Sequence, residues 1–222
     1  MRALLSRRQS EAHALLATDG PARIKLCGMS REQDIRACNL VRPDLVGFIV
    51  DFPKSHRSVS PERAGELAVR LDEGIYPVGV FVDADPGLVV RMASDDAISL
   101  AQLHGHEDEA YIAELRTHTD VGIIQAFRVQ SAADVERAQR SSADLVLLDA
   151  GQGSGKTFDW ALLTGIKRPY LLAGGLGPDN VAQAIAALSP WGVDMSSGVE
   201  SDRLKDADKM AAAVAAVRNV SG

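Results

Sequence analysis

The segment Tyr170-Leu-Leu-Ala-Gly-Gly-Leu-Gly177 begins as a short apolar run and breaks into a turn of small residues. The segment Trp191-Gly-Val-Asp-Met-Ser-Ser-Gly-Val-Glu200 repeats this pattern further along the chain. Each apolar run predicts a buried strand, and each turn offers backbone N–H groups at the start of a following helix. Such turns can hold a phosphate without a charged side chain. Two of them on consecutive strands indicate a phosphorylated small molecule as the ligand.

The alternation of apolar runs and helical patterns continues along the whole chain, which is typical of repeated βα units and a parallel sheet. We expect eight strands, at residues 23–27, 45–49, 77–82, 97–103, 121–127, 145–149, 170–173 and 192–195. Because no long linker or composition shift interrupts them, the units favour an α/β fold with one closed (β/α)8 TIM barrel over an open sheet. Helix starts are expected at Ser30 with Gln33, at Pro61 and at Pro178. The weakest helix, at residues 158–163, is the one before the seventh strand.

The chain of 222 residues divides into a short extension and one domain. Residues 1–22 are expected to form an extra amphipathic helix, and residues 23–222 the barrel. No apolar run approaches the roughly 18 residues that cross a bilayer, and the first residues lack the apolar centre of a secretory signal. We therefore expect no membrane association.

Charge and cysteine content exclude further classes. The formal net charge of −6 argues against a nucleic-acid surface, which needs clustered Lys and Arg. The two cysteines, Cys27 and Cys38, show neither disulfide nor zinc spacing, so we expect a reducing, cytoplasmic location. His104 and His106 form an HxH pair without an evident third ligand. No metal and no cofactor are therefore expected.

In parallel α/β architectures ligands bind beyond the carboxyl ends of the strands. The polar residues that close the expected strands are therefore the first candidates for a functional site: Cys27, Asp51, Asp83, His104, Arg128 and Asp149.

Lys25 and Cys27 alternate with two aliphatic residues in the first expected strand. Because side chains alternate across a strand, both should point into the barrel while the aliphatic residues meet the helices. A buried ammonium group needs an anionic partner from the protein or the ligand. A nearby cation favours the thiolate, so we expect a lowered pKa for the Cys27 thiol. A packed thiol without a role is the alternative, and it is the interpretation we favour for Cys38, which shares an apolar helix face with Ile35.

Asp149 interrupts an otherwise hydrophobic strand at its carboxyl end. A carboxyl group partly withdrawn from water at the top of a barrel strand is suited to donate a proton. The alternative is a carboxylate that only caps the following loop. Arg57, in the loop after the second strand, could bind a substrate carboxylate through its guanidinium fork. Gln102 and His104 share strand parity and could line the same pocket.

The segment Gly151-Gln-Gly-Ser-Gly-Lys-Thr157 suggests a nucleotide-binding loop because it follows a strand. The phosphate-binding motif GxxxxGK[ST] requires a glycine where this chain has Ala150. We therefore keep a nucleotide-binding protein only as a less favoured alternative.

Eight segments together resemble the phosphoribosylanthranilate isomerases of tryptophan biosynthesis, and they occur in the order typical of that family. They are Lys25-Leu-Cys-Gly-Met, Gly47-Phe with Pro53-Lys-Ser-His-Arg-Ser-Val-Ser-Pro, Val78-Gly-Val-Phe-Val, Gln102-Leu-His-Gly, Leu147-Leu-Asp, Gly153-Ser-Gly-Lys-Thr-Phe-Asp-Trp, Ala173-Gly-Gly-Leu and Val193-Asp-Met-Ser-Ser-Gly-Val-Glu.

The resemblance implies a TIM barrel that converts N-(5-phosphoribosyl)anthranilate into the 1-amino-1-deoxyribulose phosphate by an Amadori rearrangement. It implies that Cys27 is the general base and Asp149 the general acid. It further implies that Arg57 contacts the anthranilate carboxylate and that Asp194 is a polar active-site residue. The implied phosphate site comprises Gly174, Gly175, Ser196, Ser197 and Gly198. Lys25, Gln102 and His104 complete the expected substrate-binding set, and the assembly is expected to be a monomer or a homodimer.

The chain departs from the family pattern in three places: the extension before Arg23, Ser58 where an aromatic residue is common, and a short connection from Asp149 to Gly153. None of these departures removes a catalytic group. A dual-substrate phosphoribosyl isomerase is a second possibility, although that family has an aspartate where this chain has Cys27. A catalytically silent barrel that binds phosphosugars is a third.

Overall fold

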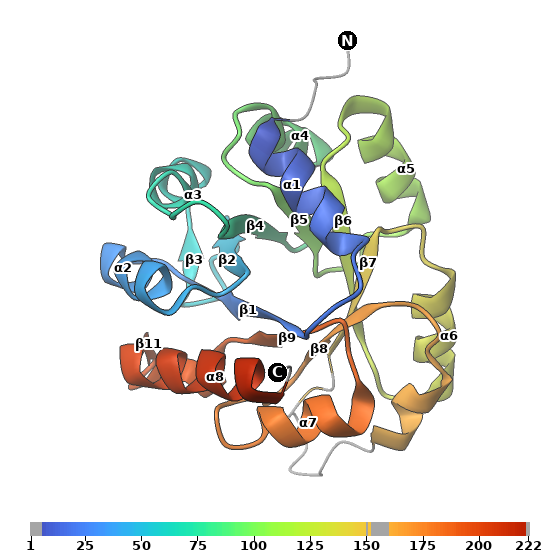
Figure 1. Cartoon of the computed structure of the whole chain (residues 1–222). Coiled ribbons are helices and arrows are strands. Elements are labelled where there is room, and N and C mark those ends of the chain that lie inside the picture. The colour runs from blue at the N-terminus through green and yellow to red at the C-terminus, as the bar shows by residue number, and fades with distance from the viewer. Residues whose placement is uncertain (1–5, 150, 152–159, 221–222) are drawn as a thin grey trace.

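The computed structural model describes residues 6–149, 151 and 160–220. Eight parallel strands close into a barrel, because β1 pairs with both β2 and β9 (Figure 1). The barrel strands are β1 (Arg23–Cys27), β2 (Leu45–Val50), β4 (Tyr76–Phe81), β5 (Leu100–Leu103), β6 (Gly122–Arg128), β7 (Leu145–Asp149), β8 (Tyr170–Ala173) and β9 (Gly192–Met195). The predicted single-domain (β/α)8 fold is confirmed.

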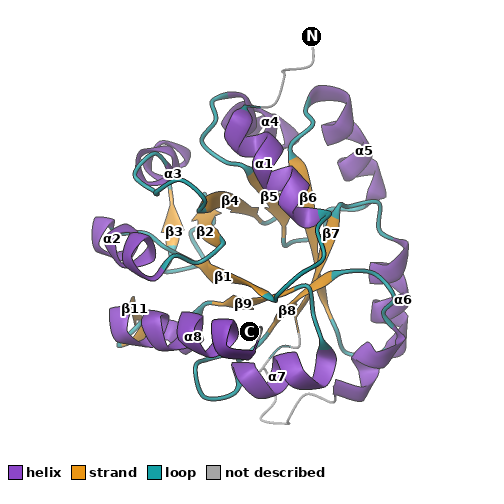
Figure 2. Ribbon diagram, in the orientation of Figure 1, coloured by secondary structure: helices purple, strands orange, loops and turns teal. Residues whose placement is uncertain are grey.

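Helices surround the barrel on its outer side (Figure 2). They are α2 (Glu32–Val41), α3 (Pro61–Ala68), α4 (Pro86–Ser94), α5 (Glu109–His118), α6 (Ala132–Arg140), α7 (Val181–Leu188) and α8 (Ala207–Val220). Before β8, where the sequence predicts a weak helix at residues 158–163, the structure has a 3₁₀ helix, η1 (Trp160–Gly165). Residues 158–159 of the predicted segment lie outside the described residues. Within the described part of the chain, no helix is long and apolar enough to span a membrane.

Two of the three predicted helix starts are wrong, and side-chain hydrogen bonds explain both. Helix α3 begins at Pro61 as predicted. Helix α2 begins later than Ser30, because the Asp34 carboxylate accepts the backbone N–H groups of both Ser30 and Arg31. Helix α7 begins at Val181 rather than Pro178, because the Asn180 side chain first closes a turn on the preceding loop.

Side chains alternate along β1 as the sequence predicts. Ile24 and Leu26 belong to the apolar layer between the strands and the helices. Lys25 and Cys27 take the opposite side, inside the barrel, and both are buried. The polar face of this strand is therefore enclosed by the barrel.

Helix α1 (Arg7–Leu16) covers the end of the barrel at which the strands begin (Figure 1). Ala12 and Leu16 are buried in a cluster that includes Leu45 and Leu100, the first residues of β2 and β5. The Gln9 side chain is also buried, and its amide donates to two backbone carbonyl oxygens, one in α4 and one in the segment between α4 and β5. Helix α1 therefore packs at the end of the barrel opposite the carboxyl ends of the strands.

Short elements that the sequence pattern does not predict shape the loops beyond the carboxyl ends. Strand β3 (Ser58–Val59) pairs with β2. After β9 come the 3₁₀ helix η2 (Ser197–Val199) and a hairpin of β10 (Glu200–Ser201) and β11 (Leu204–Lys205). Two-residue strands are too short to show a periodicity, which is why the sequence pattern gave no sign of them.

Candidate active site

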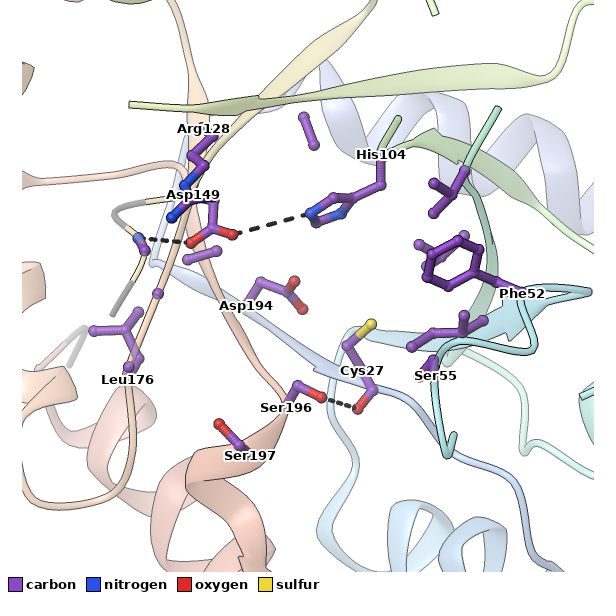
Figure 3. Close-up of a pocket in the computed structure, with 18 of the residues that line it drawn as sticks. Cys27, Phe52, Ser55, His104, Arg128, Asp149, Leu176, Asp194, Ser196 and Ser197 are labelled. Atoms are coloured by element: carbon purple, nitrogen blue, oxygen red, sulfur yellow. Dashed lines mark hydrogen bonds and ion pairs between the residues drawn. The ribbon is translucent and has the colours of Figure 1, made fainter. Parts of the chain in front are cut away.

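A pocket of about 770 Å³ opens at the carboxyl ends of the barrel strands (Figure 3). This volume is in the range of sites for small molecules. The polar residues that line it are Cys27, Ser55, His104, Arg128, Asp149, Asp194, Ser196 and Ser197, and the glycines are Gly105, Gly151, Gly174 and Gly175. Several predicted site residues therefore meet in one cavity.

Lys25 lies beneath the pocket rather than in its wall. Its side chain is fully buried, and its Nζ donates to the Asp194 Oδ1 atom at 2.9 Å. The two residues are neighbours in the register of β1 and β9. Burial lowers the pKa of Lys25, but the charges of Asp194 and Cys27 and the hydrogen bonds to both together outweigh this effect and raise the pKa overall. The anionic partner that the sequence required for Lys25 is thus a protein carboxylate.

Cys27 lines the pocket directly above Lys25 and is only 6% exposed. Burial raises the pKa of its thiol, and Asp194 adds to this effect, while Lys25 lowers it. The net direction is upward, so the prediction of a lowered thiol pKa is wrong. The reason is that a cation already paired with a carboxylate cannot offset the loss of hydration around the sulfur.

Gly47, on β2, provides the space into which these groups fit. A Cβ atom at this position would lie 2.7 Å from Cys27 Sγ and 3.1 Å from Lys25 Nζ. Real Cβ contacts are not found at the first of these distances. The absence of a side chain at Gly47 therefore leaves the space that the sulfur and the ammonium group occupy.

Asp149 closes β7 on a different side of the pocket from Cys27 (Figure 3). Its Oδ1 atom accepts the Gly151 N–H at 2.8 Å, and its Oδ2 atom lies 4.0 Å from Nε2 of His104. His104 in turn contacts the fully buried Gln102, whose Nε2 lies 2.8 Å from His104 Nδ1. Enclosure lowers the pKa of His104 despite the nearby carboxylates.

The turns after β8 and β9 form another part of the pocket wall. Gly174 and Gly175 have φ angles of 101° and 64°, which favour glycine. Ser196 and Ser197 line the wall beside them, and Ser196 donates to the Cys27 carbonyl oxygen at 3.1 Å. Gly198 does not line the pocket. A Cβ there would overlap the Leu176 carbonyl oxygen, so this glycine allows the two turns to pack together.

Arg57 lies outside the pocket wall in an ion pair that the sequence did not predict. Its Nε and Nη2 atoms donate to the two carboxylate oxygens of Glu200 at 2.6 and 2.7 Å. Lys205 Nζ also donates to Glu200, at 2.7 Å, and to the Ser196 carbonyl oxygen at 2.9 Å. Burial raises the pKa of Glu200, but Arg57 and Lys205 outweigh it and lower the pKa to about 2. This network joins the β2 loop to the turn after β9.

The lining residues that the predicted site did not include are mostly apolar residues and glycines, but Phe52, Ser55 and Arg128 are also among them. Phe52 and Ser55 come from the β2 loop, and Arg128 closes β6 beside Asp149. Arg128 closes an expected strand, which is a sufficient signal in the sequence, whereas nothing in the pattern distinguishes Phe52 or Ser55 from their neighbours.

Other polar groups of the sequence analysis lie elsewhere. His106 is exposed and pairs with Asp83, so the two histidines of the HxH pair diverge. Cys38 is buried in the core, where burial raises the pKa of its thiol to about 12. Among the described residues, no group of three His, Cys, Asp or Glu side chains could hold a metal ion. Residues 152–157 of the nucleotide-binding alternative lie outside the described residues.

Comparison with known proteins identifies the family. Residues 24–216 match the model of N-(5'-phosphoribosyl)anthranilate isomerase, a match that begins after helix α1. A relative of that name from Endomicrobium trichonymphae is 38% identical over 203 residues, covering 89% of this chain and 99% of its own.

Solved structures agree with the sequence relatives. The phosphoribosyl anthranilate isomerase of Thermotoga maritima is 35% identical with a TM-score of 0.80, covering 89% of this chain and 99% of that one. Another phosphoribosyl anthranilate isomerase, crystallised with reduced 1-(o-carboxyphenylamino)-1-deoxyribulose 5-phosphate, is 34% identical with a TM-score of 0.79 and the same coverage. The chain therefore belongs to the N-(5'-phosphoribosyl)anthranilate isomerase family.

Proposed function

We propose that this chain converts N-(5'-phosphoribosyl)anthranilate into 1-(2-carboxyphenylamino)-1-deoxyribulose 5-phosphate, a step of tryptophan biosynthesis. The observation that carries the proposal is the arrangement of Cys27 and Asp149. A thiol and a carboxyl group face one pocket from different strands, and small-residue turns after β8 and β9 form part of its wall (Figure 3). A related structure holds a reduced form of the same product.

In the proposed reaction Asp149 is the general acid. It gives its proton to the ring oxygen of the ribose, the C1–O bond breaks, and the nitrogen lone pair forms the C=N bond of an iminium ion. Asp149 suits this role because it lies at the pocket wall with one oxygen held by Gly151. A positioned acid of this kind contributes about 10² to 10⁴ in rate.

Cys27 is the proposed general base. Its thiolate removes the C2 proton, the electron pair forms the C1=C2 bond, and the iminium nitrogen becomes neutral. The enolamine then ketonises by taking a proton at C1 and losing the proton of the C2 hydroxyl. Because burial raises the pKa of the thiol, the buried cation of Lys25 is needed to stabilise the thiolate. The role that we propose for Lys25 is therefore to support the base from below the pocket.

The remaining predicted residues would hold the substrate. Gly174, Gly175, Ser196 and Ser197 would bind the phosphate, and Gly198 would keep their two turns together. Asp194 and His104 would contact the sugar, because both line the pocket between the acid and the base (Figure 3).

The anthranilate group would lie toward the β2 loop. The Phe52 ring faces the pocket there, and aromatic rings pack well in offset or edge-to-face geometry (Figure 3). Arg57 would bind the anthranilate carboxylate through the guanidinium fork that now holds Glu200. The substrate carboxylate would thus compete with Glu200 for this cation.

A fluorescence assay tests the proposal. Anthranilate fluorescence should fall after N-(5'-phosphoribosyl)anthranilate is added to the wild-type protein, and the product should accumulate in equal amount. Binding of the product without any fluorescence loss would identify a catalytically silent barrel instead. Turnover of the corresponding aminoaldose of histidine biosynthesis as well would identify a dual-substrate isomerase.

A further inference from the structure

Gln102 and His104 form a hydrogen-bonded pair on the inner face of the barrel. They lie two residues apart at the end of β5, so both side chains take the same face of the strand. Gln102 is fully buried, and its amide Nε2 lies 2.8 Å from Nδ1 of His104. His104 itself lines the pocket, whereas Gln102 does not. Gln102 therefore acts on the pocket only through the histidine.

This contact favours a His104 ring that carries its proton on Nε2. An amide N–H can only donate, so Nδ1 must accept with its lone pair, and a neutral ring then carries its proton on Nε2. The Nε2 atom is the one that faces Asp149, at 4.0 Å from Oδ2 (Figure 3). The ring therefore presents an N–H group to the carboxyl group.

The surroundings of His104 favour the neutral ring. Enclosure by protein lowers its pKa, and the positive charge of Lys25 acts in the same direction. The carboxylates of Asp149, Asp194 and Glu107 oppose this change without reversing it. A neutral ring has one donor and one acceptor, so with Nδ1 bound to the Gln102 amide, the N–H group at Nε2 remains available to Asp149, 4.0 Å away.

The other end of the Gln102 amide has no comparable contact among the described residues. Its Oε1 atom is buried and has no hydrogen-bond partner within the described part of the chain. An unpaired buried oxygen costs free energy, and an apolar side chain of similar volume would avoid that cost. In the part of the chain that the structure describes, His104 is the hydrogen-bond partner of this amide.

We propose that Gln102 is a positioning residue that holds His104 in the Nε2–H tautomer, so that the ring stabilises Asp149 after this carboxyl group has given up its proton. The proposal rests on the proposed function for the role of Asp149. In the step concerned, the proton moves from Asp149 to the ribose ring oxygen. The resulting carboxylate accepts the Nε2–H group as a hydrogen-bond donor, and no proton leaves His104.

Nitrogen-15 NMR of the histidine rings tests the tautomer directly. In the uniformly labelled wild-type protein without substrate, the His104 signals, assigned by their loss in His104→Asn, should show a protonated Nε2 and an unprotonated Nδ1. In Gln102→Met, which removes the donor at similar volume, the ring should populate both tautomers. In Gln102→Glu, the new carboxylate should accept a hydrogen bond from Nδ1–H, so that Nδ1 rather than Nε2 is the protonated nitrogen.

Kinetics provide the second readout. We expect kcat to fall about three- to tenfold in Gln102→Met, the effect of losing one hydrogen bond, with KM unchanged. Gln125→Met is the matched control. Gln125 is a buried glutamine on the neighbouring strand β6, and it bonds to Glu107 and Ser141 rather than to His104. The His104 signals should not change in this variant.

Two results would overturn the proposal. The first is a wild-type His104 that carries its proton on Nδ1. The second is a Gln102→Met protein in which both the tautomer and kcat are unchanged. The spectra contain no substrate, so these results would contradict the positioning role alone. A wild-type protein with the expected tautomer but no turnover would contradict the proposed function instead.

Discussion

Lys25 Nζ and Asp194 Oδ1 form a 2.9 Å ion pair inside the barrel, and the two residues lie side by side in the register of β1 and β9. The pair places a cation directly below the Cys27 thiol while a carboxylate largely neutralises it. Asp194 thereby controls how much of the Lys25 charge acts on the sulfur.

Replacing Asp194 by Asn should lower the pKa of the Cys27 thiol. The substitution removes a carboxylate that raises the thiol pKa and leaves Lys25 free to stabilise the thiolate. Each unit of decrease makes alkylation by iodoacetamide at neutral pH about tenfold faster. The Cys27→Ser protein measures the background from Cys38, whose thiol pKa of about 12 keeps it unreactive. An unchanged alkylation rate would show that Asp194 does not control the thiol.

Gly47→Ala should reduce turnover while the protein remains folded. The new methyl group would lie 2.7 Å from Cys27 Sγ, so the sulfur must move away from its place above Lys25. Misplacing a catalytic group by about 1 Å can cost about 10² in rate. Gly65→Ala in α3 is the matched control, because its methyl group would meet only Ala97 at an ordinary 3.5 Å. Equal kcat values for the two variants would contradict the prediction.

The Glu200 network should make stability depend on pH in the acid range. The pKa of Glu200 is about 2 in the folded protein and near 4.5 in the unfolded chain. A carboxyl group with a lowered folded pKa contributes stability that is complete above pH 4.5 and is lost as the pH falls toward 2. That contribution is at most about 3 kcal/mol. In urea titrations, the free energy of unfolding of the wild type should exceed that of Glu200→Gln above pH 4.5, and this difference should shrink as the pH falls toward 2. A difference that stays constant over this pH range would exclude the ionisation of Glu200 as the cause.

Leu16→Ala should destabilise the protein without changing kcat. Leu16 is 5% exposed in the cluster where α1 covers the beginning of the barrel strands, so its loss leaves a cavity costing about 2–5 kcal/mol. Leu40→Ala is the matched control, because Leu40 is 84% exposed and should change the free energy of unfolding by less than about 0.5 kcal/mol. Urea unfolding compares the two. Similar values would mean that α1 does not stabilise the barrel.

The sequence predicts the fold well because strand signals are local. The observed bounds of β7, β8 and β9 equal the predicted ones. Strand β5 begins at Leu100 rather than at residue 97, because an apolar run does not reveal where pairing with a neighbouring strand starts. The predicted helix starts at Ser30 and Pro178 are wrong because the Asp34 and Asn180 side chains accept hydrogen bonds from preceding backbone N–H groups. Whether such hydrogen bonds form depends on the three-dimensional geometry of the loop.

The site was less predictable wherever it depends on contacts between distant residues. The alternation of side chains along a strand correctly predicts that Lys25 and Cys27 lie on the inner face of the barrel. The positions of Asp149 and His104 at the carboxyl ends of their strands correctly predict that both line the same pocket. The ion pair between Arg57 and Glu200 joins residues 143 positions apart, and no local pattern encodes it. The predicted direction of the pKa shift of the Cys27 thiol is wrong because the sequence does not show how completely the sulfur is buried.

The roles of Asp149 and Cys27 are tested by the kcat of Asp149→Asn and Cys27→Ala, measured as loss of anthranilate fluorescence with N-(5'-phosphoribosyl)anthranilate as substrate. Circular dichroism first establishes that each variant is folded. Each substitution should lower kcat by about 10² to 10⁴ relative to wild type. Turnover near the wild-type rate in either folded variant would contradict the roles of Asp149 as acid and Cys27 as base.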